Sequence, residues 1–564
     1  MYYLRMSSIS SETSHHQAPT HQSTDQTDTY DVAVVGYGPG AQALTALLAR
    51  KGHRVVAFER YPGLYGLPRA GHIDHETMRL VQNIADADVL EGFIREMRDE
   101  FVWLNADRDV LMRQPMEQIG DAVSGWYSDY TQWQPHLEKQ LSDGAAAAGV
   151  EVNFGWECVG VQIHASDVEL VVNRLEYDEV TQSRTRSEEF KRVRATYVVG
   201  VDGANSFVRT AMGISRVDLG FNESWLDVDL EIHGKGSVLE PNHCQICDPE
   251  RPRLVMPLGA SHRRFEWKLM PGETAEEMQT TEKAWELLKE FGVTAENHTI
   301  ARLLVYAFQA RIAETWNVQR RVLLSGDAAH TMPPFAGQGL LASLRDSVNL
   351  AWKLDLVLRG CVGEELIDAY EVERRPHATA WTLISLGLGE LQSITDPVKA
   401  AERDALLRSG DPLPMPAFPV LEAGVLQQKA GGPPPAVAGQ LGLQGIVRSA
   451  TAEGRFDDVF GGLCFSIVTT GGDARSLLTD EQISFLDSIG TVLVEVVDAD
   501  AQPGDGQAAD VRGTYRSYLE ENGVSAVINR PDFYVFGAVA DLADLGDLVG
   551  ELAGQLGWVE GVHD

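Results

Sequence analysis

A short apolar run followed at once by closely spaced glycines constrains this chain more than any other feature. Residues 31–35 read Asp-Val-Ala-Val-Val, and residues 36–41 read Gly-Tyr-Gly-Pro-Gly-Ala. A helical pattern then covers residues 42–51, and a second strand-like run occupies residues 54–58. The pattern predicts a βαβ unit that holds a dinucleotide pyrophosphate at a helix N-terminus.

Each position of this glycine-rich turn has a physical purpose. Gly36 permits the tight turn, Gly38 lets the backbone approach a pyrophosphate, and Ala41 lets the helix pack closely. Glu59 ends the second strand, where its carboxylate can accept hydrogen bonds from a ribose diol. An ordinary glycine-rich turn is the alternative, and it is the weaker one because strand, helix and acidic residue occur together.

Size and charge narrow the classes of function. With 564 residues the chain is long enough for three to four domains at roughly 150 residues each. It carries 47 Lys and Arg against 82 Asp and Glu, a formal charge of −35. Such a charge repels phosphate backbones and anionic lipid headgroups, so we expect no nucleic-acid or membrane partner. No apolar run of about 18 residues predicts a transmembrane helix.

The five cysteines are scattered, which suits a reducing cytoplasm better than a disulfide framework. Cys244 and Cys247 form the one pair at zinc or dithiol spacing. A zinc site would need further ligands at compatible spacing, and a redox dithiol stays open as a minor alternative. We expect buried thiols and no metal.

Changes in composition and pattern divide the chain into successive segments. We expect a disordered extension (1–29), a nucleotide-binding part (30–220), an inserted sheet domain (221–319), a second nucleotide-binding part (320–395), a helical and Pro/Gly-rich connector (396–453) and a small α/β domain (454–564).

Two further segments decide which dinucleotide is bound. Residues 198–203 form a strand that ends in Asp-Gly, and residues 321–327 form a strand that ends in Gly-Asp. The second is followed by Pro-Pro-Phe-Ala-Gly-Gln-Gly-Leu at residues 333–340 and a long helix. With these three motifs in this order, the chain resembles the class A flavoprotein aromatic hydroxylases, single-component monooxygenases with a para-hydroxybenzoate-hydroxylase-like fold.

The resemblance implies an α/β fold: a Rossmann-like FAD-binding domain of the GR2 type, an inserted mixed-sheet substrate domain that closes over the flavin ring as a lid, and a thioredoxin-like C-terminal domain. The last contains no Cys-x-x-Cys, so it performs no dithiol exchange and a structural or oligomerising role is expected. A homodimer is a further expectation.

The resemblance also implies FAD as cofactor, NADH or NADPH as reductant and O2 as co-substrate. The expected FAD-contacting residues are Gly36, Gly38, Pro39, Gly40, Ala41, Glu59, Arg60, Arg69, Gln134, Val159, Asp202, Gly326, Asp327, Pro333, Gly337, Gln338, Gly339 and Leu340. Arg69 and Pro333 are also the candidate catalytic residues, and Gln134 has a plain helix-start role as its alternative.

Within the class, the closest likeness is to 3-(3-hydroxyphenyl)propionate hydroxylases and phenol-hydroxylase-type enzymes. It implies hydroxylation of a small phenol, ortho or para to its hydroxyl, through a flavin C4a-hydroperoxide. His243, Gln245 and Tyr306 are the candidate substrate residues. No base is assigned, because His72, His243, His330 and Tyr306 qualify by residue type alone.

Other interpretations of the function stay open at this point. The same scaffold could tailor a larger polyketide-type aromatic, and a flavin-binding protein without activity or a simple NAD-dependent dehydrogenase are weaker alternatives. The main reading places the protein in aromatic catabolism in the cytoplasm.

Overall fold

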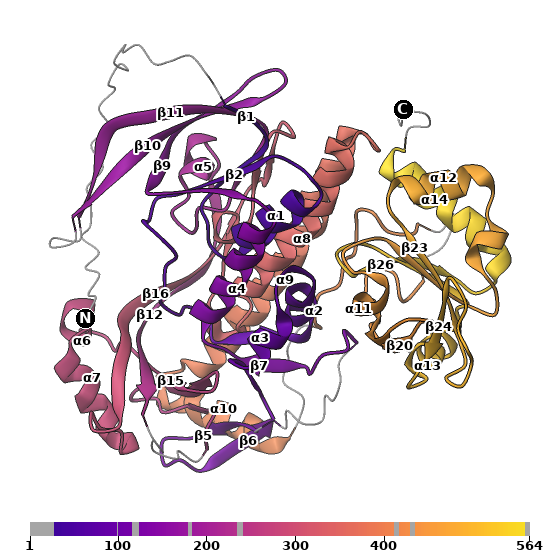
Figure 1. Ribbon diagram of the computed structural model, residues 1–564. Helices are drawn as coiled ribbons and strands as arrows, with labels where there is room; N and C mark the ends of the chain where they lie inside the picture. The colour runs from indigo at the N-terminus through magenta and orange to yellow at the C-terminus, as the bar shows by residue number, and fades with distance from the viewer. Residues whose placement is uncertain are drawn as a thin grey trace.

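The computed structural model describes residues 28–98, 100–114, 123–178, 183–233, 241–410, 417–428 and 435–558. The expected extension therefore lies outside the described residues, except that the first strand already begins at Asp28. Figure 1 shows two sheet regions joined by a central group of helices, with the C-terminal domain to one side.

The first sheet is the nucleotide-binding one, with the order β17-β18-β11-β1-β2-β8. Its core strands are parallel: β1 pairs with β11 and β2, β2 with β8, and β11 with β18. The strands are β1 (Asp28–Val35), β2 (Val55–Glu59), β8 (Glu151–Phe154), β9 (Trp156–Ile163), β10 (Val168–Asp178), β11 (Ser183–Gly200), β17 (Asn317–Val318) and β18 (Val322–Leu324). Val32 to Val35 are buried, as expected of a central strand covered on both faces.

Helices cover this sheet and connect its strands. They are α1 (Pro39–Arg50), α2 (His75–Ile84), α3 (Ala87–Glu91), α4 (Gln134–Ala147), α5 (Phe207–Ala211), α8 (Gly339–Leu358) and α9 (Asp368–Gln392), with short turns η3 (Gly326–Ala328), η4 (Pro334–Ala336) and η5 (Glu364–Ile367). Helix α1 packs against α4 and α8 (Figure 1). A three-stranded sheet, β3 (His72–Asp74), β7 (Asp129–Thr131) and β4 (Arg95–Glu96), lies at the start of α2.

The second sheet, called here the substrate sheet, has the order β19-β16-β12-β15-β14-β13-β5-β6. Its strands are β5 (Phe101–Leu104), β6 (Val110–Gln114), β12 (Arg216–Ile232), β13 (Cys244–Ile246), β14 (Arg253–Leu258), β15 (His262–Lys268), β16 (His298–Ala313) and β19 (His330–Thr331). One face is apolar and packs on α6 (Ala275–Met278), α7 (Thr281–Leu288) and η2 (Lys289–Phe291). The opposite face carries an aromatic cluster with Trp225 and Phe308 and, next to it, a charged region that is described below.

The chain enters this sheet earlier than the sequence indicates. Strands β5 and β6, which we expected in the first nucleotide-binding part, belong to the substrate sheet because β5 pairs in parallel with β13. Short strands far apart along the chain leave no local signal of their partner, so this boundary was wrong. Strand β12 also starts at Arg216, ahead of the expected boundary at residue 221.

The C-terminal domain has a seven-stranded sheet of order β21-β20-β24-β23-β22-β25-β26. Its elements are β20 (Ile446–Arg448), β21 (Glu453–Arg455), α11 (Phe456–Phe460), β22 (Ser466–Thr470), η6 (Ala474–Leu477), α12 (Asp480–Ser488), β23 (Val492–Val497), β24 (Gln507–Asp510), α13 (Thr514–Glu521), β25 (Ala526–Asn529), β26 (Val535–Val539), η7 (Leu542–Asp544) and α14 (Leu545–Leu556). It begins before residue 454, so its expected start was late. Helix α10 (Pro397–Ser409) lies in the expected connector, whose residues 411–416 and 429–434 are outside the described part.

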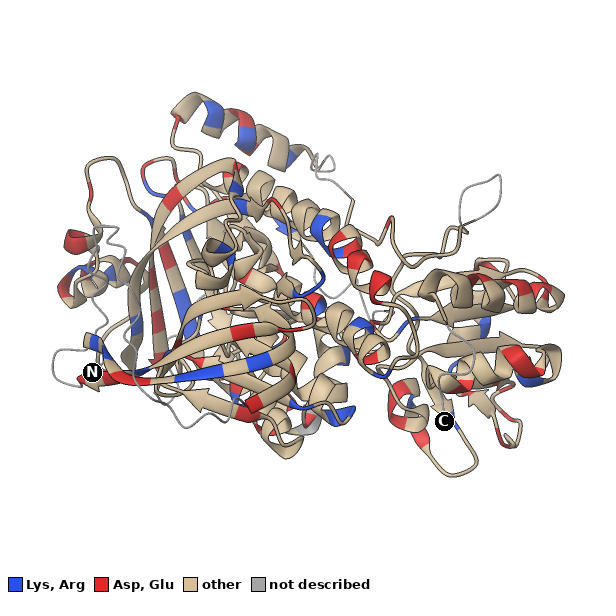
Figure 2. Cartoon of the chain, turned by 90° about the horizontal axis from the view of Figure 1, so that it is seen from above, with Lys and Arg blue, Asp and Glu red and all other residues tan. Residues whose placement is uncertain are grey.

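The charged side chains and the cysteine pair Cys244 and Cys247 are arranged as the sequence leads us to expect. Figure 2 shows both signs of charge spread over the chain, and arginines of β11 pair with carboxylates such as Glu157 and Glu169. Burial raises the pKa of Cys244 to about 11 and that of Cys247 to about 12. Among the described residues there is no group of side chains that could hold a metal, and no helix long and apolar enough to cross a membrane.

Candidate active site

The glycine-rich turn lies between β1 and α1, as the sequence predicts. Gly36 has φ +97°, and a Cβ there would lie 2.4 Å from the carbonyl oxygen of Val201. Gly38 caps α1 without a side-chain hydrogen bond, and a Cβ there would meet nothing within 4 Å. The first turn of α1 therefore presents its N-terminus to open space, which suits an anionic phosphate.

Gly40 and the fully buried Ala41 both lie where this helix packs closely. A Cβ on Gly40 would lie 2.2 Å from Oγ of Ser343 on α8. Ser347, one turn further along α8, donates a hydrogen bond from Oγ to the Gly40 carbonyl at 2.8 Å. The start of α1 is thereby fixed against the helix that follows the third motif.

Glu59 ends β2 beside the turn. Its Oε2 accepts a hydrogen bond from the Tyr37 backbone N–H at 2.8 Å, and its Oε1 accepts one from Tyr61 N–H at 2.9 Å. The carboxylate is thus held in place, and its remaining lone pairs are available to a ribose diol. Arg60, the next residue, lies 5.4 Å from the Tyr61 ring centre.

The Asp-Gly motif follows β11. Asp202 Oδ2 accepts hydrogen bonds from Phe207 N–H at 2.6 Å and Val208 N–H at 3.1 Å. Its Oδ1 is buried with no partner in the described part of the chain, and burial raises its pKa. A buried oxygen without a partner is costly unless a ligand completes it.

Arg209 joins this motif to the Gly-Asp motif, a link that the sequence did not reveal. Its guanidinium donates to the carbonyls of Ala328 and Ala204, both at 2.9 Å. Arg209, seven residues after Asp202, was visible in the sequence, but its partner Ala328 lies over a hundred residues away.

Asp346 on α8 anchors the Gly-Asp motif by hydrogen bonds, which the sequence did not indicate. Its Oδ2 accepts the Gly326 N–H at 3.0 Å and lies 2.7 Å from His330 Nε2. Its side chain is fully buried. Burial opposes ionisation, but the charges of His330 and Arg374 lower the pKa of Asp346. Asp327 lies between these contacts, is partly exposed, and its carboxylate accepts no hydrogen bond from the described residues.

The loop of residues 333–340 is braced at both ends. The Pro333 carbonyl accepts a hydrogen bond from Ser385 Oγ on α9 at 2.5 Å. Gly337 has φ +65°, and a Cβ there would lie 2.9 Å from His72 Nδ1. Gln338 occupies the N-cap position of α8 without a side-chain cap. Its Oε1 accepts a hydrogen bond from the Arg345 guanidinium at 2.7 Å. Gly339 and Leu340 then open the helix.

Gln134 has a specific role in this structure. From the buried start of α4, its Oε1 accepts the backbone N–H groups of Arg69 at 2.9 Å and Ala70 at 2.7 Å. The Arg69 carbonyl in turn accepts from Arg264 of the substrate sheet at 2.8 Å. The Arg69 segment is therefore clamped between α4 and the substrate sheet, while its side chain stays exposed.

The charged region of the substrate sheet carries three carboxylates and two guanidiniums, from Asp227, Asp229, Glu266, Arg264 and Arg302. Arg264 makes a two-point contact to Asp229, at 2.7 and 2.9 Å, and Arg302 pairs with Asp227. Burial raises the pKa of Asp227 to about 6, and burial with the charge of Asp227 raises that of Glu266 to about 8.

Glu266 differs from the other two carboxylates. Its Oε1 lies 3.7 Å from the Arg264 guanidinium, which is longer than a hydrogen bond. Its side chain is buried, at 7% exposure. It is the carboxylate of this region with the least satisfied bonding capacity.

The predicted substrate residues are not all brought together. Tyr306 on β16 lies close enough to Arg69 and Asp327 for their charges to act on it, although burial is the larger cause that raises its pKa. Gln245 and His243 are on or beside β13, four strands away from β16. At about 4.8 Å per strand this is roughly 19 Å, more than one aromatic ring spans. Phe101 packs on the His243 ring at 4.5 Å.

Val159 lies at an irregularity of β9, where the pairing with β10 shifts between Gly160 and Cys158. Its side chain is apolar, so only its backbone could form hydrogen bonds with an adenine ring.

These residues fit FAD. The three motifs lie at the ends of neighbouring parallel strands β1, β11 and β18. They carry the helix start at Gly38, which has no side-chain cap, and two carboxylates, Asp202 and Asp327, with oxygens that no described residue satisfies. The ends of such strands are where an α/β sheet binds dinucleotides.

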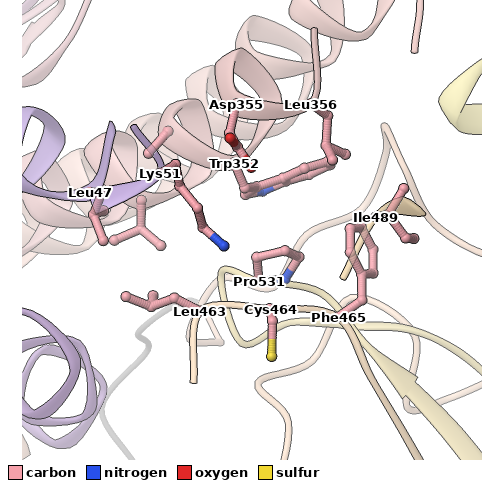
Figure 3. Close-up of a pocket in the computed structure, with 12 residues that line it drawn as sticks. Leu47, Lys51, Trp352, Asp355, Leu356, Leu463, Cys464, Phe465, Ile489 and Pro531 are labelled. Carbon is pink, nitrogen blue, oxygen red and sulfur yellow. The ribbon is translucent and has the colours of Figure 1, made fainter. Parts of the chain in front are cut away.

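A separate hollow lies between α1, α8 and the C-terminal domain (Figure 3). Its lining is largely apolar, with Trp352, Leu356, Phe465 and Ile489, and Lys51 projects into it. None of the predicted site residues lines it. The chemistry predicted from the sequence therefore does not take place there.

Comparison with known proteins agrees with this assignment. Residues 29–384 match the family described as FAD binding domain, and residues 439–555 match the HcaD C-terminal domain. The chain belongs to the family of FAD-dependent aromatic hydroxylases.

Two relatives cover nearly the whole chain. A probable NADH-specific resorcinol 4-hydroxylase of Rhodococcus jostii is 35% identical, covering 93% of this chain and 94% of its own. A 3-(3-hydroxy-phenyl)propionate/3-hydroxycinnamic acid hydroxylase of Mycolicibacterium gilvum is 30% identical, covering 90% and 89%.

A solved structure shares the fold. Aklavinone-11 hydroxylase with FAD and aklavinone superposes with a TM-score of 0.74 at 24% identity, over 93% of this chain and 99% of that one. The expected FAD-dependent hydroxylase class is confirmed.

Proposed function

We propose that this enzyme hydroxylates a small, uncharged phenol of the resorcinol type, with NADH as the reductant. The observation that carries the proposal is the charged region of the substrate sheet, where three carboxylates share two guanidiniums. The name of the Rhodococcus relative gives both the substrate class and the nicotinamide.

Charge favours an uncharged substrate. Arg264 and Arg302 are already paired with Asp229 and Asp227, so neither offers a free guanidinium to a substrate carboxylate. Above about pH 8, where Glu266 is ionised, the excess negative charge would also repel such a group in a poorly solvated site. Phenolic hydroxyls, in contrast, can donate hydrogen bonds to carboxylates.

Glu266 is the proposed acceptor for the proton of the substrate hydroxyl. A phenol has a pKa near 10 and is a better electron donor once ionised. The pKa of Glu266, about 8, makes its ionised oxygen a better matched acceptor for that proton than an ordinary carboxylate would be. Its open bonding capacity leaves an oxygen available for this contact.

The FAD contacts are proposed as the sequence predicts them. Gly36, Gly38, Glu59 and Asp202 would hold the ADP part, while Asp327 and the turn at residues 337–340 would hold the ribityl chain and ring. When bound, FAD supplies the route by which two electrons from NADH reduce O2, so that one oxygen atom enters the substrate ring and the other leaves as water. Pro333 and Arg69 would shield this space and orient the substrate.

A phenol with a short carboxylate side chain is the second candidate, because the exposed Arg69 side chain offers a cation. The Mycolicibacterium relative is named for such substrates. Replacing Arg69 by Met distinguishes the two: it should raise KM strongly for 3-(3-hydroxyphenyl)propionate and much less for resorcinol. The thioredoxin-like nature of the C-terminal domain, a homodimer and a cytoplasmic location stay predictions.

The test is a substrate panel on the purified, FAD-loaded enzyme. NADH oxidation and product mass would be measured with resorcinol, phenol and 3-(3-hydroxyphenyl)propionate. We expect resorcinol to give the highest kcat/KM, with a product one oxygen atom heavier. The proposal is overturned if the carboxylated phenol is preferred, or if no phenol stimulates NADH oxidation.

A further inference from the structure

The C-terminal domain reaches the loop behind the candidate flavin site through a continuous chain of buried contacts. Residues 530–534 connect β25 to β26 and lie against α8 and α9. Tyr534, at 5% exposure, places its hydroxyl oxygen 3.3 Å from Nε2 of His377 on α9. This contact crosses from one domain to the other.

The next contact fixes the state of the His377 ring. Arg374 NH1 lies 3.0 Å from His377 Nδ1, and a guanidinium can only donate. Nδ1 therefore accepts, and the ring carries its proton on Nε2, which faces Tyr534. Burial and the nearby charge of Arg374 lower the pKa of His377 well below its ordinary value, so this neutral form is the stable one.

The chain continues to the loop itself. Arg374 Nε donates to Asp346 Oδ1 at 2.9 Å, and Asp346 Oδ2 accepts the Gly326 N–H at 3.0 Å. Asp346 also holds His330, at the far end of the same loop. All of these side chains are at most 5% exposed, so water does not readily replace a lost contact.

A second group of contacts anchors the same segment. Arg530 pairs with Glu373 through two bonds, at 3.0 and 2.6 Å, and Asp532 accepts from Asn349 at 2.8 Å. Tyr534 is thus presented to α9 by an anchored backbone. The geometry places Glu373, which contacts the C-terminal segment, directly beside Arg374, which contacts the loop.

We propose that residues 530–534 position the loop that carries Asp327, with Tyr534 and His377 acting as positioning residues through Arg374 and Asp346. The C-terminal domain then has a part in FAD binding although it contains none of the three motifs. The inference concerns cofactor binding and is independent of which phenol is the substrate.

The test compares two buried tyrosines of the C-terminal domain. Tyr534→Phe removes the hydroxyl that meets His377. Tyr515→Phe is the matched control, because the Tyr515 hydroxyl donates to the Leu443 carbonyl at 3.2 Å, within the C-terminal part of the chain and not to α9. His377→Gln removes the same interdomain contact from its other side.

Two readouts that need no turnover are used. Hydrogen–deuterium exchange of residues 326–331 is measured in the protein freed of FAD, and the dissociation constant of FAD is measured by fluorescence titration. For Tyr534→Phe and His377→Gln we expect faster exchange and FAD binding weaker by about 3- to 10-fold, the range of one lost hydrogen bond. Tyr515→Phe should change the exchange rate of residues 326–331 and the dissociation constant of FAD by less than about 2-fold.

Three outcomes overturn the proposal. One is unchanged exchange and FAD affinity in both Tyr534→Phe and His377→Gln. Another is an equal change in Tyr515→Phe. The third is a lower melting temperature in Tyr534→Phe and His377→Gln with no change at residues 326–331, which would mean that the contact only stabilises the fold.

Discussion

Gln134 Oε1 accepts the backbone N–H of Arg69 at 2.9 Å, so a helix-start side chain fixes the segment that carries the candidate catalytic arginine. The same oxygen accepts the N–H of Ala70 at 2.7 Å. One side chain therefore determines the path of the chain past the substrate sheet.

Gln134→Ala should loosen this segment. Two backbone N–H groups lose their acceptor, and each such loss costs about 1–3 kcal/mol where water cannot enter. We expect kcat/KM for the phenol to fall by about 10-fold or more, measured by NADH oxidation. Lys139→Ala, on the exposed side of the same helix, is the control. Equal behaviour of the two variants would argue against the clamp.

The variants Gly38→Ala and Gly40→Ala should separate two effects. The first tests how closely FAD approaches the start of α1, and the second tests how α1 packs against α8. A methyl group on Gly38 meets no protein atom, so the melting temperature of the FAD-free protein should be unchanged while FAD binding weakens by about 10-fold or more. A methyl group on Gly40 would collide with Ser343, so this variant should destabilise the FAD-free protein itself. Thermal unfolding and FAD titration of both variants check this, and unchanged FAD affinity in Gly38→Ala would contradict the assignment.

Glu266→Gln should change how stability depends on pH. Burial, with the charge of Asp227, raises the pKa of Glu266 from 4.5 to about 8, so between these values the folded protein keeps a proton that the unfolded chain has lost. The free energy of unfolding must therefore fall as pH rises across this window. Asp227, with its pKa raised to about 6, acts in the same direction at lower pH.

Because glutamine does not titrate, the melting temperature of Glu266→Gln relative to the unchanged protein should rise from pH 6 to pH 8.5. Glu276→Gln on the exposed surface of α6 is the control and should show a constant difference. In turnover, the inflection near pH 8 in kcat/KM should vanish with Glu266→Gln. An inflection that persists would show that another group accepts the proton.

Arg530→Met should strongly destabilise the protein. Burial opposes ionisation of Glu373, but Arg530 and Lys353 hold its pKa at about 2, and removing one partner of such a buried pair costs about 3–5 kcal/mol. Arg475→Ala breaks the exposed pair with Asp487 and should cost at most about 1 kcal/mol. Urea unfolding measures both, and similar losses would mean that the buried pair contributes little.

Prediction from the sequence succeeds best for elements that residues close together along the chain specify. The turn at Gly36, the strand that ends at Asp202 and the helix that begins at Gly339 are each specified by residues within one or two turns of chain. Their shared order along the chain then identified the FAD-dependent class without any long-range contact.

The sequence predicts least where distant segments meet. Nothing near Asp346 indicates that it accepts the Gly326 N–H, and nothing near residue 101 indicates the pairing of β5 with β13. The substrate residues show the same limit. Tyr306 and Gln245 were chosen by residue type, and only the order of the strands reveals how far apart they lie.

The long strands β12 and β16 restrict how the enzyme admits its substrate. They pair from Arg216 to Ile232, with two register shifts. On its other edge β16 pairs with β19, where Ile312 lies opposite His330. Swinging the substrate sheet as a lid would have to bend this ladder and pull on the loop that carries Asp327. Movement of the sheet would therefore be coupled to the position of Asp327, the residue expected to hold the ribityl chain.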